Sequence, residues 1–334
     1  MKKMLKFLVT LVLICIIALT VFFAYVCIEH AVPDKMNYIV NADQETCTIT
    51  GAERSPGFVL YIPKEINGYT VTKIASMAFH GSNFYFVILP ETIESIGAGA
   101  FIECEKLISI DGLEKCTKLI EIKDETFSGC HYLDEITLPQ GLEKIGEHAF
   151  AFCYDLSSID IPSTVTIIDN GAFALNNRMT KIKIPASVEY IGLAAFEGCM
   201  CLKSIEVEAQ NPNYCSVDGV LYSKDMTTIY AYPCSKEGNE FTISESVTTI
   251  VVCAFSYPRN LETLNIPSSV KNIEKDAIKD PTNISALFKI NYNGTVEMWN
   301  SINKDPDWAW RYLPDYTIYC TDGKIKKDGT VIYN

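Results

Sequence analysis

The chain has 334 residues, a formal net charge of −13 and a hydrophobic fraction of 48%. The acidic balance argues against nucleic acid and anionic lipid as partners of the body as a whole, because both repel a negatively charged surface. The apolar content is sufficient for a buried core, so the chain is not a disordered acidic tail.

The N-terminus has the features of an export segment. Lys2, Lys3 and Lys6 precede residues 7–28, which contain no charge and are long enough to cross a bilayer at roughly 20 residues per crossing. A cleaved signal peptide has a shorter apolar region and a small-residue cleavage site, and neither is clear here. We therefore favour an uncleaved transmembrane signal anchor, with residues 1–6 in the cytoplasm and the rest outside the cell. Secretion after cleavage is the alternative.

Residues 29–73 are predicted to form a linker and an N-terminal cap, and residues 74–281 carry a repeat. Phe127, Phe150, Phe173 and Phe196 follow one another at intervals of 23 residues. One unit reads IPASVEYIGLAAFEGCMCLKSI over residues 184–205, and its apolar positions recur in the other units. Self-similarity at this period indicates a repeat architecture.

Each unit is predicted to form one short strand and one return arc. In residues 156–161 the apolar side chains stand at the first, fourth and sixth positions, which is typical of a half-buried strand, and Pro162 ends it. Val165 and Ile168 then lead to Phe173 with a spacing that suits a turn or a short helix. A single coil of about 23 residues cannot bury its own apolar side chains, so the coils stack into a solenoid.

The pattern IPxxVxxIGxxAFxxCxxLxxI resembles the leucine-rich repeats of the BspA-like type, which occur in surface proteins of gut and oral bacteria and of some parasitic protists. The resemblance covers about residues 38–334. It implies a leucine-rich repeat solenoid with an interaction or adhesion role at the cell surface. The chain departs from the pattern at Asn176 and Pro258, which stand where other units have Cys, and at Ile278, which replaces Phe.

One coil is enlarged within residues 208–245. Phe196 and Phe255 are separated by one period plus 36 residues, and the extra stretch NPNYCSVDGVLYSKDMTTIYAYP (residues 211–233) is similar to an insertion often met in the family. Its Asp218-Gly219 pair indicates a hairpin turn. Residues 282–334 are similar to the C-terminal ending of the family and are predicted to form a C-terminal cap.

The thirteen cysteines are interpreted mainly as buried structural thiols. Cys15 and Cys27 lie in the apolar N-terminal segment, and the remaining eleven cannot all pair within one chain. Stacking aligns the cysteines that follow a repeat aromatic by three residues into an internal ladder, and small apolar side chains suit that position. This ladder consists of Cys104, Cys130, Cys153 and Cys199. Some disulfides, or metal binding, are the alternatives.

Motifs for catalysis and cofactor binding are absent from the sequence. There is no nucleophile elbow, no HExxH, no phosphate loop and no dinucleotide fingerprint. We therefore expect no enzymatic activity, no cofactor and no bound metal.

Function is then left to the surface. If Leu156 and Ile159 point inward, Ser158 and Asp160 point outward, and the equivalent residues of the other coils tile one sheet face. The tyrosines of the insertion are a second candidate, because tyrosine is frequent at recognition surfaces, although it is also a good strand residue. The candidate partner-binding residues are Glu135, Thr137, Ser158, Asp160, Lys181, Lys183, Ser204, Glu206, Tyr214, Tyr222, Tyr230 and Tyr232.

Three functions compete at this stage. The first is a membrane-anchored interaction or adhesion module that binds a protein or glycan on a host or neighbouring cell. The second is a structural envelope protein without a diffusible ligand. The third is an enzyme hidden in residues 282–334, whose tryptophans more simply cap the last coil.

Overall fold

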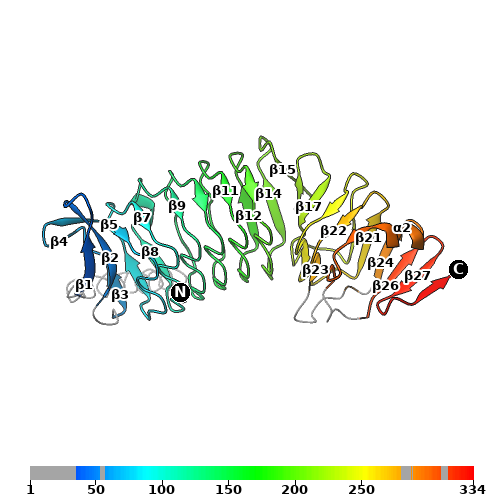
Figure 1. The fold of residues 1–334 in the computed structure, drawn as a ribbon, viewed down its shortest axis with the longest axis horizontal. Helices are drawn as coiled ribbons and strands as arrows, with labels where there is room; N and C mark the ends of the chain where they lie inside the picture. Colours follow the sequence, from blue (N-terminus) through cyan, green and yellow to red (C-terminus); the bar gives the residue numbers. More distant parts are fainter. Residues whose placement is uncertain (1–34, 53–56, 280–286, 288, 310–314) are drawn as a thin grey trace, which may run out of the picture.

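The computed structural model describes residues 35–52, 57–279, 287, 289–309 and 315–334. Figure 1 shows the coils stacked side by side along the long axis of the molecule, with strands β15 and β17 near the middle of the stack. The predicted cytoplasmic residues 1–6 and the predicted membrane anchor 7–28 lie outside the described residues. Within the described part, no helix is both long enough and apolar enough to cross a membrane.

The leucine-to-proline part of each repeat lies on one side of the coil, and we call its parallel strands the first sheet. Side chains alternate there as predicted, with Ile182 and Ile184 buried and Lys181 and Lys183 exposed. The sheet has three sections, ordered β3-β6-β8, β12-β14 and β18-β21-β24-β26-β27-β28. Its strands are β3 (Val59–Tyr61), β6 (Phe86–Ile88), β8 (Ser109–Asp111), β12 (Lys181–Ile184), β14 (Ser204–Val207), β18 (Glu240–Thr242), β21 (Thr263–Pro267), β24 (Lys289–Asn293), β26 (Thr317–Cys320), β27 (Gly323–Lys326) and β28 (Val331–Tyr333).

The isoleucine-glycine part of each repeat forms a second sheet. Its strands are β5 (Tyr69–Ile74), β7 (Ser95–Ile96), β9 (Glu121–Ile122), β10 (Lys144–Ile145), β11 (Ile167–Ile168), β13 (Tyr190–Ile191), β17 (Thr228–Ala231), β19 (Thr249–Ile250), β22 (Asn272–Ile273) and β25 (Asn303–Lys304). The glycine that follows is required by close packing of coils. A Cβ at Gly192 would lie 2.3 Å from the backbone nitrogen of Asn170 in the preceding coil.

These two sheets correct the prediction of one strand per coil. The isoleucine of the isoleucine-glycine pair, predicted to lie in a turn or short helix, lies instead in a short strand that pairs in parallel with its neighbours, for example Ile145 with Ile168. Residues 156–161, predicted to be a strand, are extended but unpaired in the central coils. The backbone hydrogen bond from Ser157 to Asp134 is long there, at 3.4 Å, so the first sheet is interrupted.

Two left-handed residues make the corners on either side of the repeat aromatic. The residues two before it and two after it have φ between +50° and +74°, which rules out a helix. The corner after the aromatic is glycine at positions 81, 129 and 198, but Phe152 and Leu175 occupy it in two central coils. A left-handed non-glycine residue costs roughly 1–2 kcal/mol, so these coils carry backbone strain.

The aromatic rings form a continuous stack through the core. Phe79, Phe101, Phe127, Phe150, Phe173 and Phe196 lie with ring centroids 5.4 to 6.0 Å apart and nearly parallel planes. All are buried. Figure 1 shows why this stack is possible, since each coil is a near copy of the one before it.

The cysteine ladder is buried beside this stack, as predicted. The thiols of Cys104, Cys130, Cys153 and Cys199 each donate to the carbonyl oxygen of the aromatic residue in the preceding coil, at 3.1 to 3.2 Å. Cysteines within the described residues are all free. Asn176 replaces Cys without loss, because its amide nitrogen donates to the carbonyls of Phe150 and Phe173.

Antiparallel strands lie at both ends of the described chain. At the N-terminal end β1 (Met36–Val40) pairs with β2 (Thr46–Ala52), and β4 (Glu65–Ile66) pairs with β5. At the C-terminal end β27 pairs with β26 and β28. The remaining elements are a 3₁₀-helix (Leu113–Lys115), the strands β20 (Phe255–Ser256) and β23 (Ile278–Lys279), and helix α2 (Val296–Ser301).

Truncation of a stacked ring should be far more costly than truncation of an outward side chain. We expect Phe150→Ala to lower the free energy of unfolding by about 3–5 kcal/mol, since it leaves a cavity between two rings. Asp160→Ala, on the exposed side of the same coil, should stay within about 0.5 kcal/mol. Urea unfolding measures both, and equal effects would contradict the register of the coils.

The thiol ladder predicts a loss of stability at alkaline pH. Burial raises the pKa of Cys104 and of Cys199 from 9.0 to about 12. The unfolded chain therefore releases these protons first, so the stability is present below pH 9 and is lost as the pH rises toward 12. At pH 10 each such thiol should lower the free energy of unfolding by about 1 kcal/mol.

Urea unfolding at pH 7.5 and pH 10 checks this effect, with Cys104→Ala plus Cys199→Ala as the control. The double variant should lose less stability between the two pH values than the unmodified protein. An identical loss would show that these thiols already titrate in the folded state.

Candidate interaction surface

The outward side chains of the first sheet form the surface that we call the strand face. Glu135 and Thr137, and likewise Ser158 and Asp160, are exposed as predicted, although they stand on extended segments and not on paired strands. The alternation of burial was thus correct where the hydrogen-bonded ladder was not. These four residues remain candidates for partner contact.

Lys181 and Lys183 are exposed, but both have acidic partners on the next strand. The ammonium group of Lys181 lies 2.8 Å from Glu206, and that of Lys183 lies 2.6 Å from Glu208. The hydrogen bond from Lys183 lowers the pKa of Glu208, and the same contact raises the pKa of Lys183. This pair of lysines is therefore neutralised by its neighbours and is not a free basic patch.

Ser204 is only half exposed, because the insertion folds over it. The turn residue Gly219 packs on Ser204, and its carbonyl oxygen accepts a hydrogen bond from the Ile205 amide at 2.9 Å. The Ser216 hydroxyl donates to the Ile205 carbonyl at 2.5 Å. The insertion thereby satisfies the outer edge of β14, where the first sheet stops.

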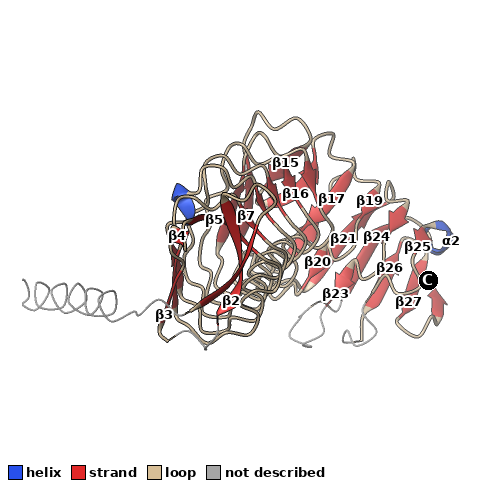
Figure 2. Cartoon of the chain, turned by 60° about the vertical axis from the view of Figure 1, so that its left-hand side comes forward, coloured by secondary structure: helices blue, strands red, loops and turns tan. Residues whose placement is uncertain are grey.

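The strand face resumes after the insertion with uncharged polar residues. Parallel register places Thr242 beside Asn265, Asn265 beside Asn291, and Asn291 beside Tyr319. The Asn265 amide donates to the Thr242 hydroxyl at 2.9 Å, and the Asn291 amide donates to the Asn265 oxygen at 2.6 Å. Figure 2 shows β21, β24 and β26 next to one another in this part of the sheet.

This row borders a groove of about 320 Å³, which we call the asparagine groove. Its lining combines the row with buried apolar side chains such as Ile243, Ile266 and Tyr292, and with exposed Glu245. A hollow of this size with a few placed polar groups is typical of a binding site. The sequence pattern included Asn265 in the strand face but missed Asn291, which lies 26 residues further on instead of 23.

The tyrosines of the insertion are mostly core residues, which corrects their prediction as exposed anchors. Tyr214, Tyr222 and Tyr232 are buried, and only Tyr230 is partly exposed. Burial raises the pKa of Tyr222 and of Tyr232 to about 12. Their rings fill the space that a regular coil would fill, so they cannot reach a partner in the folded protein.

Tyr214 and its neighbours replace a missing strand. In the insertion β15 (Tyr214–Val217) and β16 (Val220–Ser223) form a hairpin with the predicted turn at Asp218 and Gly219. The Tyr214 hydroxyl accepts the Ile191 amide at 2.9 Å, and the Asn211 amide donates to the Val188 and Pro185 carbonyls. Side chains thus close the edge of β13.

Tyr232 is the aromatic of the enlarged coil. It precedes Phe255 by 23 residues, stacks on it at 5.2 Å, and bonds to the next coil through its backbone as the repeat phenylalanines do. The interval of one period plus 36 residues therefore begins with the long step and ends with a normal one. The spacing contained this signal, but the change from Phe to Tyr concealed it.

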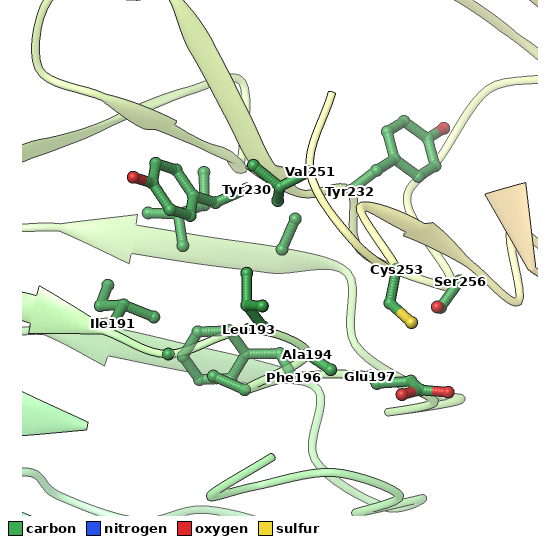
Figure 3. Close-up of a pocket in the computed structure, with 14 residues that line it drawn as sticks. Ile191, Leu193, Ala194, Phe196, Glu197, Tyr230, Tyr232, Val251, Cys253 and Ser256 are labelled. Carbon is green, nitrogen blue, oxygen red and sulfur yellow. The ribbon is translucent and has the colours of Figure 1, made fainter. Parts of the chain in front are cut away.

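A small cavity of about 20 Å³ lies at the junction beside the insertion. Figure 3 shows the Cys253, Ser256 and Glu197 side chains on one side of it and the Tyr230 ring on the other. The space suits one water molecule. Burial and then the charge of Glu197 raise the pKa of Cys253 to about 12, so its thiol is a poor nucleophile.

Glu197 forms an ion pair across the enlarged coil. Its carboxylate lies 2.7 Å from the Lys279 ammonium group, although the two residues are 82 positions apart. Burial disfavours the charged amine, but the hydrogen bond and the charge of Glu197 outweigh it and raise the pKa of Lys279. In the described residues, no cluster of three or more His, Cys, Asp or Glu side chains could hold a metal ion.

Stacked coils, a buried ring ladder and an open sheet face define a β-solenoid of the leucine-rich repeat class. The sequence matches the BspA type leucine rich repeat region in six copies, over residues 64–119, 112–216 and 213–285. Since these spans cover more than half of its length, the chain belongs to this family. No enzyme family is indicated, and no curated protein matches the sequence.

Three solved structures share the fold. A leucine-rich cell surface protein from Faecalibacterium prausnitzii is 24% identical, with a TM-score of 0.59, over 81% of this chain and 96% of that one. The pneumococcal vaccine antigen PcpA is 22% identical, with a TM-score of 0.63, over 78% and 82%. A leucine-rich repeat protein from Bacteroides ovatus is 24% identical, with a TM-score of 0.52, over 78% and 70%.

The Tyr214 hydroxyl provides a direct test of the core role of the insertion. Tyr214→Phe should lower the free energy of unfolding by about 1–3 kcal/mol, because the buried Ile191 amide loses its acceptor. Tyr190→Phe, which changes an exposed ring on the adjacent strand, should stay within about 0.5 kcal/mol. Thermal or urea unfolding compares the two, and similar values would refute the edge-closing role.

Proposed function

We propose that this protein is a cell-surface interaction module that binds a partner protein through the asparagine groove of the strand face. Family membership supports a repeat scaffold with no catalytic task. The apolar segment 7–28, with lysines before it, supports export and anchoring in the cell membrane with the solenoid outside. Adhesion to a host or neighbouring cell is the biological role that fits such an arrangement.

The observation that carries the proposal is the contrast between the two parts of the strand face. In the central part, Lys181 and Lys183 are already paired with glutamates. In the C-terminal part, uncharged amides and a hydroxyl line a hollow with an apolar floor. Neutral polar groups lose less free energy than charges do when a partner displaces their water. The groove is therefore the better place for a buried contact.

Neighbouring charges fit a partner with basic residues near its contact surface. Glu240 and Glu245 are exposed beside the groove, and the whole chain is strongly acidic. Complementary charge speeds encounter and selects against acidic competitors more than it adds affinity. Binding should consequently weaken as the salt concentration rises.

The test uses cells that carry the full chain, with host cells and matrix proteins as candidate partners. Asn291→Ala should weaken binding about tenfold, because it removes a groove amide and frees its neighbour Asn265. The double change Lys181→Ala and Lys183→Ala should weaken it less than about threefold, because those charges are already paired.

Equal losses in these two variants would place the contact elsewhere on the strand face. If the protein is distributed over the cell envelope and the full chain binds no candidate partner, the structural envelope role would be favoured instead. Unchanged thermal unfolding of both variants is required for the comparison, and the partial exposure of Asn291 makes it achievable.

A further inference from the structure

A second cluster of exposed side chains lies at the corner of two central coils, away from the strand face. The His131 and Tyr154 rings stack with centroids 4.6 Å apart and an interplanar angle of 20°. The Phe152 ring stands nearly perpendicular to that of Tyr154, at 81° and 6.3 Å. Phe152 and Tyr154 are 39% and 36% exposed. We call these three residues the aromatic corner.

Phe152 is the unusual member, because its backbone is left-handed, with φ of +60°. The same corner is glycine at positions 81, 129 and 198, where it carries no strain. A bulky aromatic residue is disfavoured in this conformation, and Phe152 is too exposed to recover much stability from packing. Strain that the fold does not need is a reason to look for a function at the site.

Polar groups flank the aromatic corner on the following coil. Asp155 and Arg178 form an ion pair at 3.4 Å, and both side chains are accessible to solvent. The Asp155 amide donates to the His131 carbonyl, and the Arg178 amide donates to the Tyr154 carbonyl, so both lie directly beside the rings. Between them in the fold, the Asn177 side-chain oxygen is buried without a hydrogen-bond partner.

We propose that the aromatic corner binds a neutral hexose unit of a carbohydrate chain. Tyr154 and Phe152 give a floor and a wall at right angles, which matches the flat C–H face and the edge of a pyranose ring. The negative face of an aromatic ring attracts C–H groups polarised by neighbouring oxygens. Asp155 accepts and Arg178 donates hydrogen bonds to hydroxyl groups at the rim, as a polyol requires.

The size of the cluster favours a sugar over a protein partner. A stable protein interface buries about 800 Å² on each side and takes about 20–30 residues. Here three rings and one ion pair stand among exposed charged residues such as Glu105, Lys106 and Asp134. A lipid is disfavoured for the same reason, because the charged rim would lose its water without compensation.

The test is saturation-transfer NMR on the purified full chain, kept in a detergent without a sugar headgroup. The probes are maltohexaose, cellohexaose and chitohexaose, which differ in linkage and in the substituent at carbon 2. We expect at least one of them to bind, with the saturation transferred mainly to ring C–H protons. Failure of all three to bind would overturn the proposal, as would binding of an aromatic peptide in their place.

Phe152→Gly separates recognition from folding. It removes the wall of the site but installs the residue that other coils use at this corner, so the melting temperature should stay equal or rise. We expect affinity for the oligosaccharide to fall at least tenfold. Tyr190→Ser, which removes an exposed ring from the second sheet, is the matched control and should leave affinity unchanged. Retained affinity in Phe152→Gly, or an equal loss in Tyr190→Ser, would overturn the proposal.

The groove variant keeps this inference independent of the proposed function. Asn291→Ala should bind the oligosaccharide as the unmodified protein does, because the asparagine groove and the aromatic corner lie on different coils. A loss of sugar binding in Asn291→Ala would assign the carbohydrate to the groove and overturn the assignment to the aromatic corner.

Discussion

The constraint on which this structure depends is that each coil must satisfy the backbone edge of its neighbour. A coil of about 23 residues has open N–H and C=O groups on both sides, and buried groups of this kind are costly when unpaired. Parallel strands, ring stacking and the thiol or amide donors of the cysteine ladder meet this requirement together. Asn176 shows that the requirement is for a donor at this position and not for sulfur.

The insertion shows how the same requirement is met when the repeat fails. No strand follows β13 or β14 directly, and polar side chains and a turn carbonyl take their place. The two clusters of core residues meet within the insertion, one including Tyr214 and the other Tyr222. The ion pair between Glu197 and Lys279 crosses the same junction. An irregular coil can therefore interrupt both sheets without dividing the solenoid.

Much of the fold followed from spacing alone, because burial in a stacked coil depends on period. The 23-residue interval predicted the solenoid, the inward and outward alternation, the buried cysteine ladder and the hairpin turn at Asp218. It did not reveal the second strand, since two-residue strands have no alternation to detect. Burial of Tyr214 and Tyr222 was not predictable either, because tyrosine suits both a core and a surface. The asparagine groove depends on tertiary register, which a 26-residue step conceals.

Amide hydrogen exchange tests the claim of continuous edge closure most directly. The amide of Ile191 bonds to the Tyr214 hydroxyl, that of Tyr232 bonds to the carbonyl of Ala254, and that of Phe150 bonds to the carbonyl of Ala172 in an uninterrupted region. If closure continues through the insertion, all three amides exchange only by opening of the whole stack and are protected to a similar degree. Exchange of the Ile191 and Tyr232 amides orders of magnitude faster than that of Phe150 would show that the insertion opens separately, and it would contradict the account.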